Sequence, residues 1–384
     1  MVRPIRILHV VISLDPGGME NGIVNISNGL DSSDYVTDVF CLERPGTFAP
    51  RLPHDSRLVV HGKPPGFSPG AVFGLRQAVL VTGADIVHSH NLGPLIYSVL
   101  ATYLGRQCPI VHGEHSELVP DELRGKRRLQ RKLGYRFCAC LHTVSAESQR
   151  QISGLCSAPK VRSIPNGVDT KRFRPRSRLE SRAAAGLPEN ALVLGIVGRF
   201  GALKGHTVLI AAFTQFAAVN PKLHLLIVGS GGPAELETRE LARSSPYSER
   251  IKFTGFQERP EELYPAMDLL VVPSMNEGMS NATLEAMASG VPVLSHESCG
   301  AREIITPGID GWIGNCATIE GLSGCLAEVL SCSERHSGMG EAARAKAVES
   351  FSIERMVRSY AGLYREVALS RGNRLEAPRR AGST

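Results

Sequence analysis

The sequence predicts an α/β protein made of two doubly wound domains. Short apolar runs of strand length alternate with segments of helical periodicity along most of the 384 residues. The alternation occurs in two series, which are separated by a polar stretch with prolines at residues 164–176. The length also exceeds what a single hydrophobic core usually supports. Together these features favour two parallel sheets, each covered by the helices that connect its strands.

The first series opens with an apolar run at residues 6–12. A glycine turn follows, and then a helix with Ile23, Ile26 and Leu30 on one face. Further strands are expected at residues 36–41, 58–60, 86–88, 110–112 and 141–144, and further helices at residues 72–81 and 94–103. This order predicts a doubly wound sheet.

The second series begins after a connector that contains the turn Asn166-Gly167 and flanking prolines. A helix is expected at residues 208–217, because its apolar residues share one face. Strands are expected at residues 192–197, 223–228, 251–253, 269–272 and 291–294. The two halves are of comparable size, and we expect them to face each other across a cleft.

These boundaries predict an N-terminal domain at residues 1–170 and a C-terminal domain at residues 171–352. A final amphipathic helix is expected at residues 353–369, with apolar residues at helical spacing. Residues 370–384 lack such periodicity and contain four arginines, so we expect a disordered tail.

Composition excludes several classes of protein. No apolar run approaches the roughly 20 residues that span a bilayer, and the start of the chain lacks a cleavage site of the signal-peptide type. We therefore expect a cytoplasmic protein. The nine cysteines are scattered without a Cys-x2-Cys pair, which favours reduced thiols over a zinc site. The net charge of +6 is too small for a nucleic-acid-binding protein.

The most informative motif follows the expected strand at residues 269–272. Glu277 lies in the loop after this strand, and Glu285 lies two turns further on, in a helix. The backbone amides of Gly278, Met279 and Ser280 lie between them at the start of that helix. A helix N-terminus with free N–H groups suits anionic or hydroxyl-rich ligands.

Two further strand-end loops offer groups for a phosphorylated ligand. Gly17 and Gly18 follow the first strand, where a close approach of backbone to phosphate requires glycine, but the loop lacks the Gly-x-Gly-x-x-Gly spacing of nicotinamide enzymes. Arg199 and Lys204 follow the first strand of the second series, where they could neutralise a diphosphate leaving group. Such cations can replace Mg²⁺, so we expect no metal and no other cofactor.

Histidines end two strands of the first half, in His88-Ser89-His90 and in the stretch that leads to His115. Four histidines could suggest zinc, but the pairs come from different strands and nothing fixes a tetrahedral site. We expect structural roles for His88 and His112 and a position on the acceptor side for His90. His115 is the better candidate for contact with substrate.

These motifs together resemble the family 4 retaining glycosyltransferases of the GT-B fold. The matching motifs, in family order, are Gly-Gly-Met-Glu at 17–20, His-Ser-His at 88–90, Gly-Glu-His at 113–115, Ile-Pro-Asn-Gly-Val-Asp at 164–169, Val-Gly-Arg at 197–199, Leu-Ile-Val-Gly-Ser-Gly at 226–231, Phe-Thr-Gly-Phe at 253–256, and the pair Glu277 and Glu285. The first motif also resembles sugar transferases of bacterial exopolysaccharide gene clusters.

The resemblance implies roles for the single residues. Gly17 and Gly18 approach the donor diphosphate, which Arg199 and Lys204 neutralise. Glu277 and the amides of Gly278, Met279 and Ser280 hold the sugar hydroxyls, Glu285 binds the ribose, and His115 faces the donor sugar. The helix at 353–369 packs back on the first domain.

The implied function is retaining transfer of a hexose from a UDP- or GDP-sugar to a glycan or lipid-linked acceptor, in cell-surface polysaccharide biosynthesis. Alternatives on the same fold are a nucleotide-sugar epimerase and a sugar-phosphate synthase. A non-catalytic nucleotide-sugar-binding protein is another alternative, which the intact charged residues disfavour.

A basic stretch at residues 124–136 is expected to form an amphipathic helix with Leu129 and Leu133 on one side. Such a helix can rest on anionic lipid headgroups at the inner face of a membrane, and a solvated helix face is the alternative. The residues expected to face the membrane are Arg127, Arg128, Arg131 and Lys132.

Overall fold

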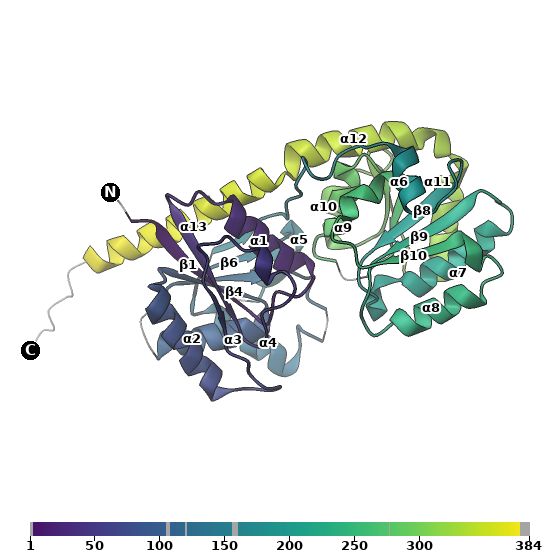
Figure 1. Cartoon of the computed structure of the whole chain (residues 1–384). Coiled ribbons are helices and arrows are strands. Elements are labelled where there is room, and N and C mark those ends of the chain that lie inside the picture. Colours follow the sequence, from purple (N-terminus) through teal and green to yellow (C-terminus); the bar gives the residue numbers. More distant parts are fainter. Residues whose placement is uncertain (1–2, 105–107, 120, 156–159, 276, 377–384) are drawn as a thin grey trace, which may run out of the picture. The chain divides into compact units, whose positions relative to one another are not determined.

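The chain folds into two compact units (Figure 1). The computed structural model describes residues 3–104, 108–119, 121–155, 160–275 and 277–376. Unit 1 comprises Met1–Asn166 and Ile353–Thr384, and unit 2 comprises Gly167–Ser352. The chain therefore passes from one unit to the other within the predicted Asn166-Gly167 turn, slightly before the expected boundary at residue 170.

Within the described residues, unit 1 contains a seven-stranded parallel sheet of order β3-β2-β1-β4-β5-β6-β7. Its strands are β1 (Ile5–Val11), β2 (Tyr35–Cys41), β3 (Leu58–Val60), β4 (Ile86–His90), β5 (Ile110–Glu114), β6 (Cys138–Thr143) and β7 (Lys160–Ser163). Its helices are α1 (Gly18–Gly29), α2 (Pro69–Thr82), α3 (Leu92–Tyr103), α4 (Gly125–Tyr135), α5 (Ala146–Ser153) and α13 (Ile353–Glu376).

Both faces of this sheet are covered, as an all-parallel sheet requires. Successive residues of β1 point to opposite faces. Ile7 therefore packs in the cluster that contains Tyr360 and Tyr364 of α13, whereas Leu8 packs in the cluster that contains Leu75 of α2. Figure 1 shows α1 and α13 on one side of the strands and α2, α3 and α4 on the other.

Unit 2 contains, among its described residues, a six-stranded parallel sheet of order β10-β9-β8-β11-β12-β13. Its strands are β8 (Leu192–Val197), β9 (Leu223–Val228), β10 (Ile251–Gly255), β11 (Leu269–Val272), β12 (Val293–His296) and β13 (Gly311–Gly314). Its helices are α6 (Arg178–Ala184), α7 (His206–Ala217), α8 (Glu235–Ser244), α9 (Asn281–Ala288), α10 (Cys299–Ile304), α11 (Ile319–Ser331) and α12 (His336–Ser350).

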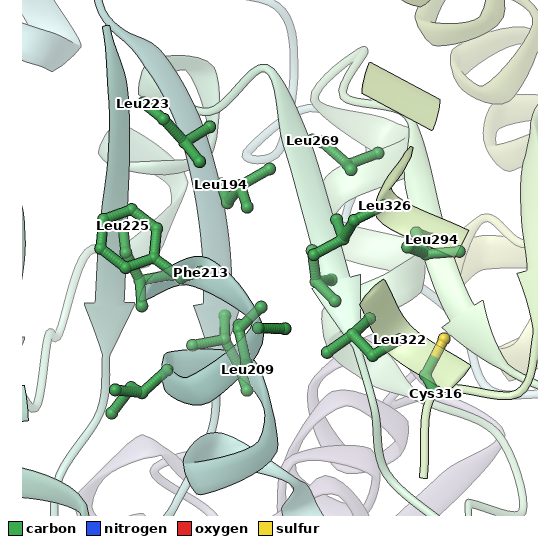
Figure 2. Packing of buried hydrophobic residues seen from close by; sticks show 14 of the residues in the cluster. Leu194, Leu209, Phe213, Leu223, Leu225, Leu269, Leu294, Cys316, Leu322 and Leu326 are labelled. Atoms are coloured by element: carbon green, nitrogen blue, oxygen red, sulfur yellow. The ribbon is translucent and has the colours of Figure 1, made fainter. Parts of the chain in front are cut away.

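The main core of unit 2 lies between the sheet and helices α7 and α11 (Figure 2). Leucines of neighbouring strands, such as Leu194 and Leu225, are inaccessible to solvent and belong to one cluster with Leu209 of α7 and Leu326 of α11. Burying a leucine side chain stabilises a fold by about 1.5–3 kcal/mol. This cluster holds the strands that end at the candidate site in a fixed order.

The predicted fold class, two doubly wound parallel domains, is confirmed. Four expected strands, β3, β8, β9 and β11, have the predicted bounds, but β7 and β13 were missed. Both are four residues long; β7 has a single apolar residue and β13 has two glycines, so their sequences lack a strand signal. Helix α13 extends to Glu376, beyond the expected end at residue 369, and therefore includes part of the predicted tail. Residues 377–384 of that tail lie outside the described residues.

Helix α13 joins the polar interior of unit 1 through two tyrosine hydroxyls. Tyr364 Oη lies 2.7 Å from His88 Nδ1, and Tyr360 Oη lies 3.4 Å from His142 Nδ1. Both tyrosines and both histidines are buried. The shorter bond is well within hydrogen-bond range, and the longer one is at its limit.

We therefore expect Tyr364→Phe to lower the free energy of unfolding by about 1–3 kcal/mol, because the substitution removes a short hydrogen bond and leaves a buried ring nitrogen without a partner. Tyr360→Phe is the matched control and should have the smaller effect. Urea unfolding of both variants measures the difference, and an equal loss in the two would contradict the role given to the Tyr364 hydroxyl.

Candidate active site

The candidate site of unit 2 begins where its strand order reverses. β8 lies between β9 and β11, so the loops after β8 and β11 diverge from neighbouring strand ends. In doubly wound sheets, ligands bind beyond the carboxyl ends of the strands at this position. Arg199 and Lys204 lie in the loop after β8, and Glu277 lies in the loop after β11.

The structure brings Lys204 and Glu277 into contact. Lys204 Nζ forms an ion pair with Glu277 Oε1, and the lysine side chain is 42% exposed while that of the glutamate is 18% exposed. The two loops are also joined by backbone, since the Met275 N–H donates to the Leu203 carbonyl at 3.1 Å. Arg199 is exposed and forms no ion pair with any described residue. A partly exposed lysine, an exposed guanidinium and a carboxylate thus share one strand-end region.

Close backbone packing explains a glycine of the first loop. Gly205 has a φ of 75°, in the left-handed region, and a Cβ at this position would lie 2.6 Å from Pro273 Cβ. Glycine adopts this conformation without steric cost. Gly205 therefore permits the loop that carries Lys204 to pack against the end of β11.

Helix α9 begins directly beyond Glu277. Ser280 is its N-cap, and the hydroxyl accepts a hydrogen bond from the Thr283 N–H at 3.3 Å. Gly278 and Met279 are buried in the turn. Gly278 is also close to α10, because a Cβ on Gly300 would lie 2.2 Å from the Gly278 carbonyl oxygen. The amide-rich helix start expected from the sequence is thus held by a cap and by a neighbouring helix.

Glu285 lies on α9 and has a partner that the sequence did not suggest. The Tyr264 hydroxyl donates to Glu285 Oε2 at 2.6 Å. Burial of Tyr264 and the nearby Glu285 charge raise the pKa of the tyrosine well above its ordinary value, so the hydroxyl remains a donor. This bond orients the Glu285 carboxylate, which the sequence resemblance implies binds the ribose.

Gly17 and Gly18 lie at the corresponding reversal of unit 1, between β1 and β4. Gly17 is the N-cap of α1 and has an extended backbone, with φ of −169°. Its lack of a side chain makes room for Glu20 of the first helical turn, since a Cβ on Gly17 would lie 2.2 Å from Glu20 Oε2. The Glu20 carboxylate therefore lies at the start of α1, where the sequence resemblance implies that the donor diphosphate binds.

Asn91 lies beside His115 in the candidate site of unit 1 and was not predicted from the sequence. It is the one non-glycine residue among those described with a positive φ, at 63° with ψ of 170°. Its side-chain oxygen accepts a hydrogen bond from the His115 N–H at 3.3 Å, and its amide nitrogen lies 3.3 Å from Met19 Sδ. Strained backbone of this kind clusters at functional sites. The signal in the sequence was an asparagine directly after the strand-end His88-Ser89-His90.

The expectation for His90 is corrected by the structure. His90 is buried, and its two ring nitrogens lie 3.0 Å from His9 Nδ1 and 2.9 Å from His115 Nε2. It is therefore not available to contact an acceptor. His115 is half-buried in the segment after β5 and remains a candidate for substrate contact. His88 and His112 have buried partners, in agreement with the structural roles expected for them.

The histidine cluster is held in the neutral state. Burial lowers the pKa of His9 to about 3 and of His115 to about 4. Burial and the charges of neighbouring histidines lower the pKa of His88, His90 and His142 well below the ordinary value. A group of uncharged imidazoles therefore lies beneath the candidate site of unit 1.

One group of described residues has a spacing that a metal ion could accept. Ligand atoms of His9, His88 and His90 lie within 4.8 Å of one another. The group contains no carboxylate or thiolate to balance a divalent charge, and His9 and His90 already form a hydrogen bond with each other. The expectation that the protein needs no metal stays a prediction.

The expectation that Arg131 faces a membrane is wrong. Arg131 is 2% exposed, and its Nε donates to Glu114 Oε1 at 2.9 Å. The Tyr135 hydroxyl donates to the same oxygen at 2.7 Å. Burial alone would raise the pKa of Glu114, but hydrogen bonding and charge from His112 and Arg131 outweigh burial and lower this pKa to about 2. A buried carboxylate needs such partners, which explains why an arginine points inward here.

The other face of α4 is exposed and both basic and apolar. Leu129 and Leu133 are 56% and 50% exposed, one helical turn apart. Exposed basic residues surround them: Arg124, Lys126, Arg127, Arg128, Lys132 and Arg136. We call these eight residues the α4 surface. Among the described residues, no helix combines the length and the apolar character that a membrane crossing needs.

Two protein-family models match the chain in succession. Residues 16–172 match the model described as Glycosyltransferase Family 4, and residues 177–346 match the model described as Glycosyl transferases group 1. Together the two models cover most of each unit, including the loops with Gly17, Lys204 and Glu277.

Individual proteins are similar over most of the chain. The EpsF protein of Bacillus subtilis is 27% identical over 326 residues, which cover 80% of this chain and 82% of that protein. A GDP-mannose-dependent phosphatidylinositol monomannoside mannosyltransferase of Corynebacterium glutamicum is 32% identical over 246 residues, 61% of this chain and 64% of that protein. The crystal structure of Anabaena Alr3699/HepE in complex with UDP and glucose matches with a TM-score of 0.80 and 22% identity, over 94% of this chain and 99% of that chain.

The neutral histidine cluster predicts a loss of stability in mild acid. In the unfolded chain histidines take up protons near their ordinary pKa of 6.5, whereas the folded cluster resists them. The unfolded state therefore binds more protons below that pH, so this stability is complete above about pH 6.5 and is lost as pH falls. His142→Gln removes one of these histidines. It should therefore reduce the slope of the unfolding free energy against pH by up to about 1.4 kcal/mol per pH unit, the slope that one additional proton bound by the unfolded state produces.

Thermal unfolding between neutral pH and about pH 5 measures this effect. This window lies above the ordinary pKa of Glu114, so that carboxylate does not interfere. His54→Gln, which replaces an exposed histidine outside the cluster, is the matched control. An unfolding temperature that stays constant over the window would contradict the prediction, as would equal flattening in both variants.

Proposed function

Because the chain belongs to the family 4 glycosyltransferases of the GT-B fold, we propose that it transfers a hexose from a UDP- or GDP-sugar to a glycan or lipid-linked acceptor with retention of anomeric configuration. The observation that carries this proposal is the contact of Lys204 with Glu277 at the strand-order reversal of unit 2, beside the exposed Arg199. We further propose that the product belongs to a cell-surface polysaccharide.

The charges of unit 2 suit a diphosphate leaving group. When the bond between the sugar carbon and the diphosphate oxygen breaks, negative charge develops on the diphosphate. Arg199 offers a planar fork for two oxygens, and Lys204 offers a point charge. The ion pair with Glu277 keeps Lys204 Nζ in this strand-end region, where the diphosphate would bind.

The proposed reaction balances without a base from the protein. A bond forms between the acceptor oxygen and the anomeric carbon on the face from which the diphosphate leaves. The acceptor proton passes to the departing diphosphate oxygen. The protein aligns the reactants and stabilises charge, and both contributions can lower the barrier by several kcal/mol.

The roles of the remaining residues follow from the same proposal. Glu277 and the start of α9 hold hydroxyls of the donor sugar, because carboxylates and helix amides bind hydroxyl-rich ligands well. Glu285, oriented by Tyr264, accepts hydrogen bonds from the ribose. Gly17 and Gly18 receive phosphate at the start of α1, where the ligand would replace the Glu20 carboxylate near Gly17. The cations take the place of a metal ion.

We also propose that the α4 surface binds anionic lipid and thereby approaches a lipid-linked acceptor. Its leucines point away from the core, while Arg131 occupies the inward face. Apolar residues embedded in basic ones are the pattern of helices that lie in a membrane interface. Each basic residue near such a surface contributes on the order of 1 kcal/mol.

The central test uses Arg199→Ala and Lys204→Ala. Both should fold and should lower kcat/KM by about 10²–10³-fold, the usual effect of removing one preorganised charge-stabilising group. Turnover of UDP- and GDP-hexoses is measured in excess EDTA. Binding of UDP and GDP is measured separately by thermal shift, because a ligand at 100 times its Kd raises the free energy of unfolding by about 2.7 kcal/mol. Arg243→Ala, an exposed arginine of α8, is the matched control.

Three outcomes would contradict parts of this proposal. A wild-type kcat/KM in both variants would show that Arg199 and Lys204 do not stabilise the leaving group. Loss of activity in EDTA that a metal restores would overturn the metal-free mechanism. Conversion of the donor sugar without an acceptor would indicate an epimerase instead.

For the α4 surface we expect the double variant Arg128→Gln, Lys132→Gln to bind anionic vesicles roughly thirtyfold more weakly than wild type, because about 2 kcal/mol is lost. Arg131 is left intact, since removing one member of a buried ion pair destabilises the fold. The control is Lys222→Gln, Arg243→Gln, which removes the same charge from exposed positions of unit 2.

Vesicle co-sedimentation at low and high salt measures the binding. Salt should weaken the binding of the wild type, because it screens exposed charges beyond about 8–10 Å. Equal binding of both double variants, or equal binding to neutral and anionic vesicles, would favour a solvated helix face.

A further inference from the structure

Three histidines of unit 1 form one hydrogen-bonded chain that ends at the candidate site. His9 Nδ1 lies 3.0 Å from His90 Nε2, and His90 Nδ1 lies 2.9 Å from His115 Nε2. His9 on β1 and His90 on β4 are buried, whereas His115 is half-buried. We propose that His9 and His90 are positioning residues that fix the tautomer of His115, so that His115 presents an N–H donor at Nδ1 to an oxygen of the donor sugar.

The geometry couples the three tautomers. A neutral imidazole has one N–H donor and one bare acceptor nitrogen. If His9 donates from Nδ1, His90 accepts at Nε2 and must carry its own proton at Nδ1. The same step repeats between His90 and His115. The three rings are therefore all protonated at Nδ1 or all protonated at Nε2.

The buried end of the chain selects between these two arrangements. His9 Nε2 is buried and has no hydrogen-bond partner in the described part of the chain. Protonation of all three rings at Nε2 would leave an orphaned N–H donor there, whereas protonation at Nδ1 leaves only a bare nitrogen. Orphaned buried N–H groups are the rarer of the two in protein interiors. The chain therefore favours Nδ1–H throughout, and the outer nitrogen of His115 is a donor.

This coupling requires uncharged rings. Burial is the main cause that lowers the pKa of all three histidines, to about 3 for His9, to about 4 for His115 and well below the ordinary value for His90. Each ring is therefore neutral near pH 7 and has the single donor that the argument uses. A protonated ring would donate from both nitrogens and break the chain.

Position and tautomer of His115 are set by different residues. Its backbone N–H donates to Asn91 Oδ1 at 3.3 Å, which places the residue, while the histidine chain decides which ring nitrogen holds the proton. The inference rests on the proposed function for the identity of the ligand, the donor sugar. The shared tautomer is a property of unit 1 alone and can be measured without any ligand.

The first experiment is NMR of the full chain labelled with ¹⁵N-histidine, in which nitrogen chemical shifts separate protonated from bare ring nitrogens. We expect His9, His90 and His115 to be neutral and protonated at Nδ1. His142→Gln is the control, because it changes a neighbouring ring 5.5 Å from that of His115 but outside the chain. It should leave the tautomer of His115 unchanged.

The second experiment compares two substitutions of His9. His9→Asn provides an amide N–H near the position of the Nδ1–H, whereas His9→Leu provides no donor. His9→Leu should give mixed tautomers at His115 and an about tenfold lower kcat/KM, the factor for one lost hydrogen bond of about 1.4 kcal/mol. His9→Asn should recover both the tautomer and the activity, which a purely structural role would not explain.

Different results would overturn the inference. One such result is that His9, His90 and His115 do not share one tautomer, and another is that all three rings are protonated at Nε2. A third is a stoichiometric metal ion bound by His9 and His90 in the purified protein. If His9→Leu fails to fold, the tautomers of His9, His90 and His115 measured in the wild type still test the inference. If no nucleotide sugar is turned over, the proposed function fails while the tautomers remain measurable, so the two failures are distinguishable.

Discussion

The reversal of strand order within each parallel sheet is the constraint on which both candidate sites depend. Loops after β8 and β11 leave their strands in opposite directions, and the space between them receives the side chains of Lys204 and Glu277. The corresponding reversal between β1 and β4 in unit 1 receives Gly17 and Asn91. Neither position is fixed by local sequence, because it follows from which strands pair. The buried leucines that hold the strands in order therefore also hold the chemistry in place.

Sequence could predict the elements whose signal is local. The runs that form β3, β8, β9 and β11 are almost entirely apolar, so their limits were predictable. Glu277 and Lys204 were predicted as site residues because strand-end loops are where such folds bind ligands, and the structure brings the two side chains together. β7 and β13 were not predictable. Both are edge strands, β7 is mostly polar and β13 contains two glycines, so they owe their conformation to pairing with a neighbour.

Arg131 shows why charge patterns along a helix are less reliable than apolar ones. A basic run predicts an exposed face, and no local pattern indicated that Glu114, buried at the end of β5, required a cation. A buried carboxylate without a partner would be strongly destabilising, and Arg131 is buried beside Glu114 as that partner. Asn91 was missed for a similar reason, because its strained backbone depends on contacts with Met19 and His115 that are distant in sequence.

The two units bring different electrostatics to the proposed reaction. Unit 2 offers partly exposed formal charges, Arg199, Lys204 and Glu277, which suit a leaving group that gains negative charge. The cluster of unit 1 is neutral, because burial makes a charged imidazole costly there. In glycosyl transfer the sugar carbon gains positive charge in the transition state. An imidazolium beside it would oppose that charge, whereas a neutral imidazole with a fixed tautomer can orient the sugar by a hydrogen bond without repelling it. Burial of His9 and His90 thus has two effects on the proposed site. It keeps the rings uncharged, and it fixes the tautomer of His115.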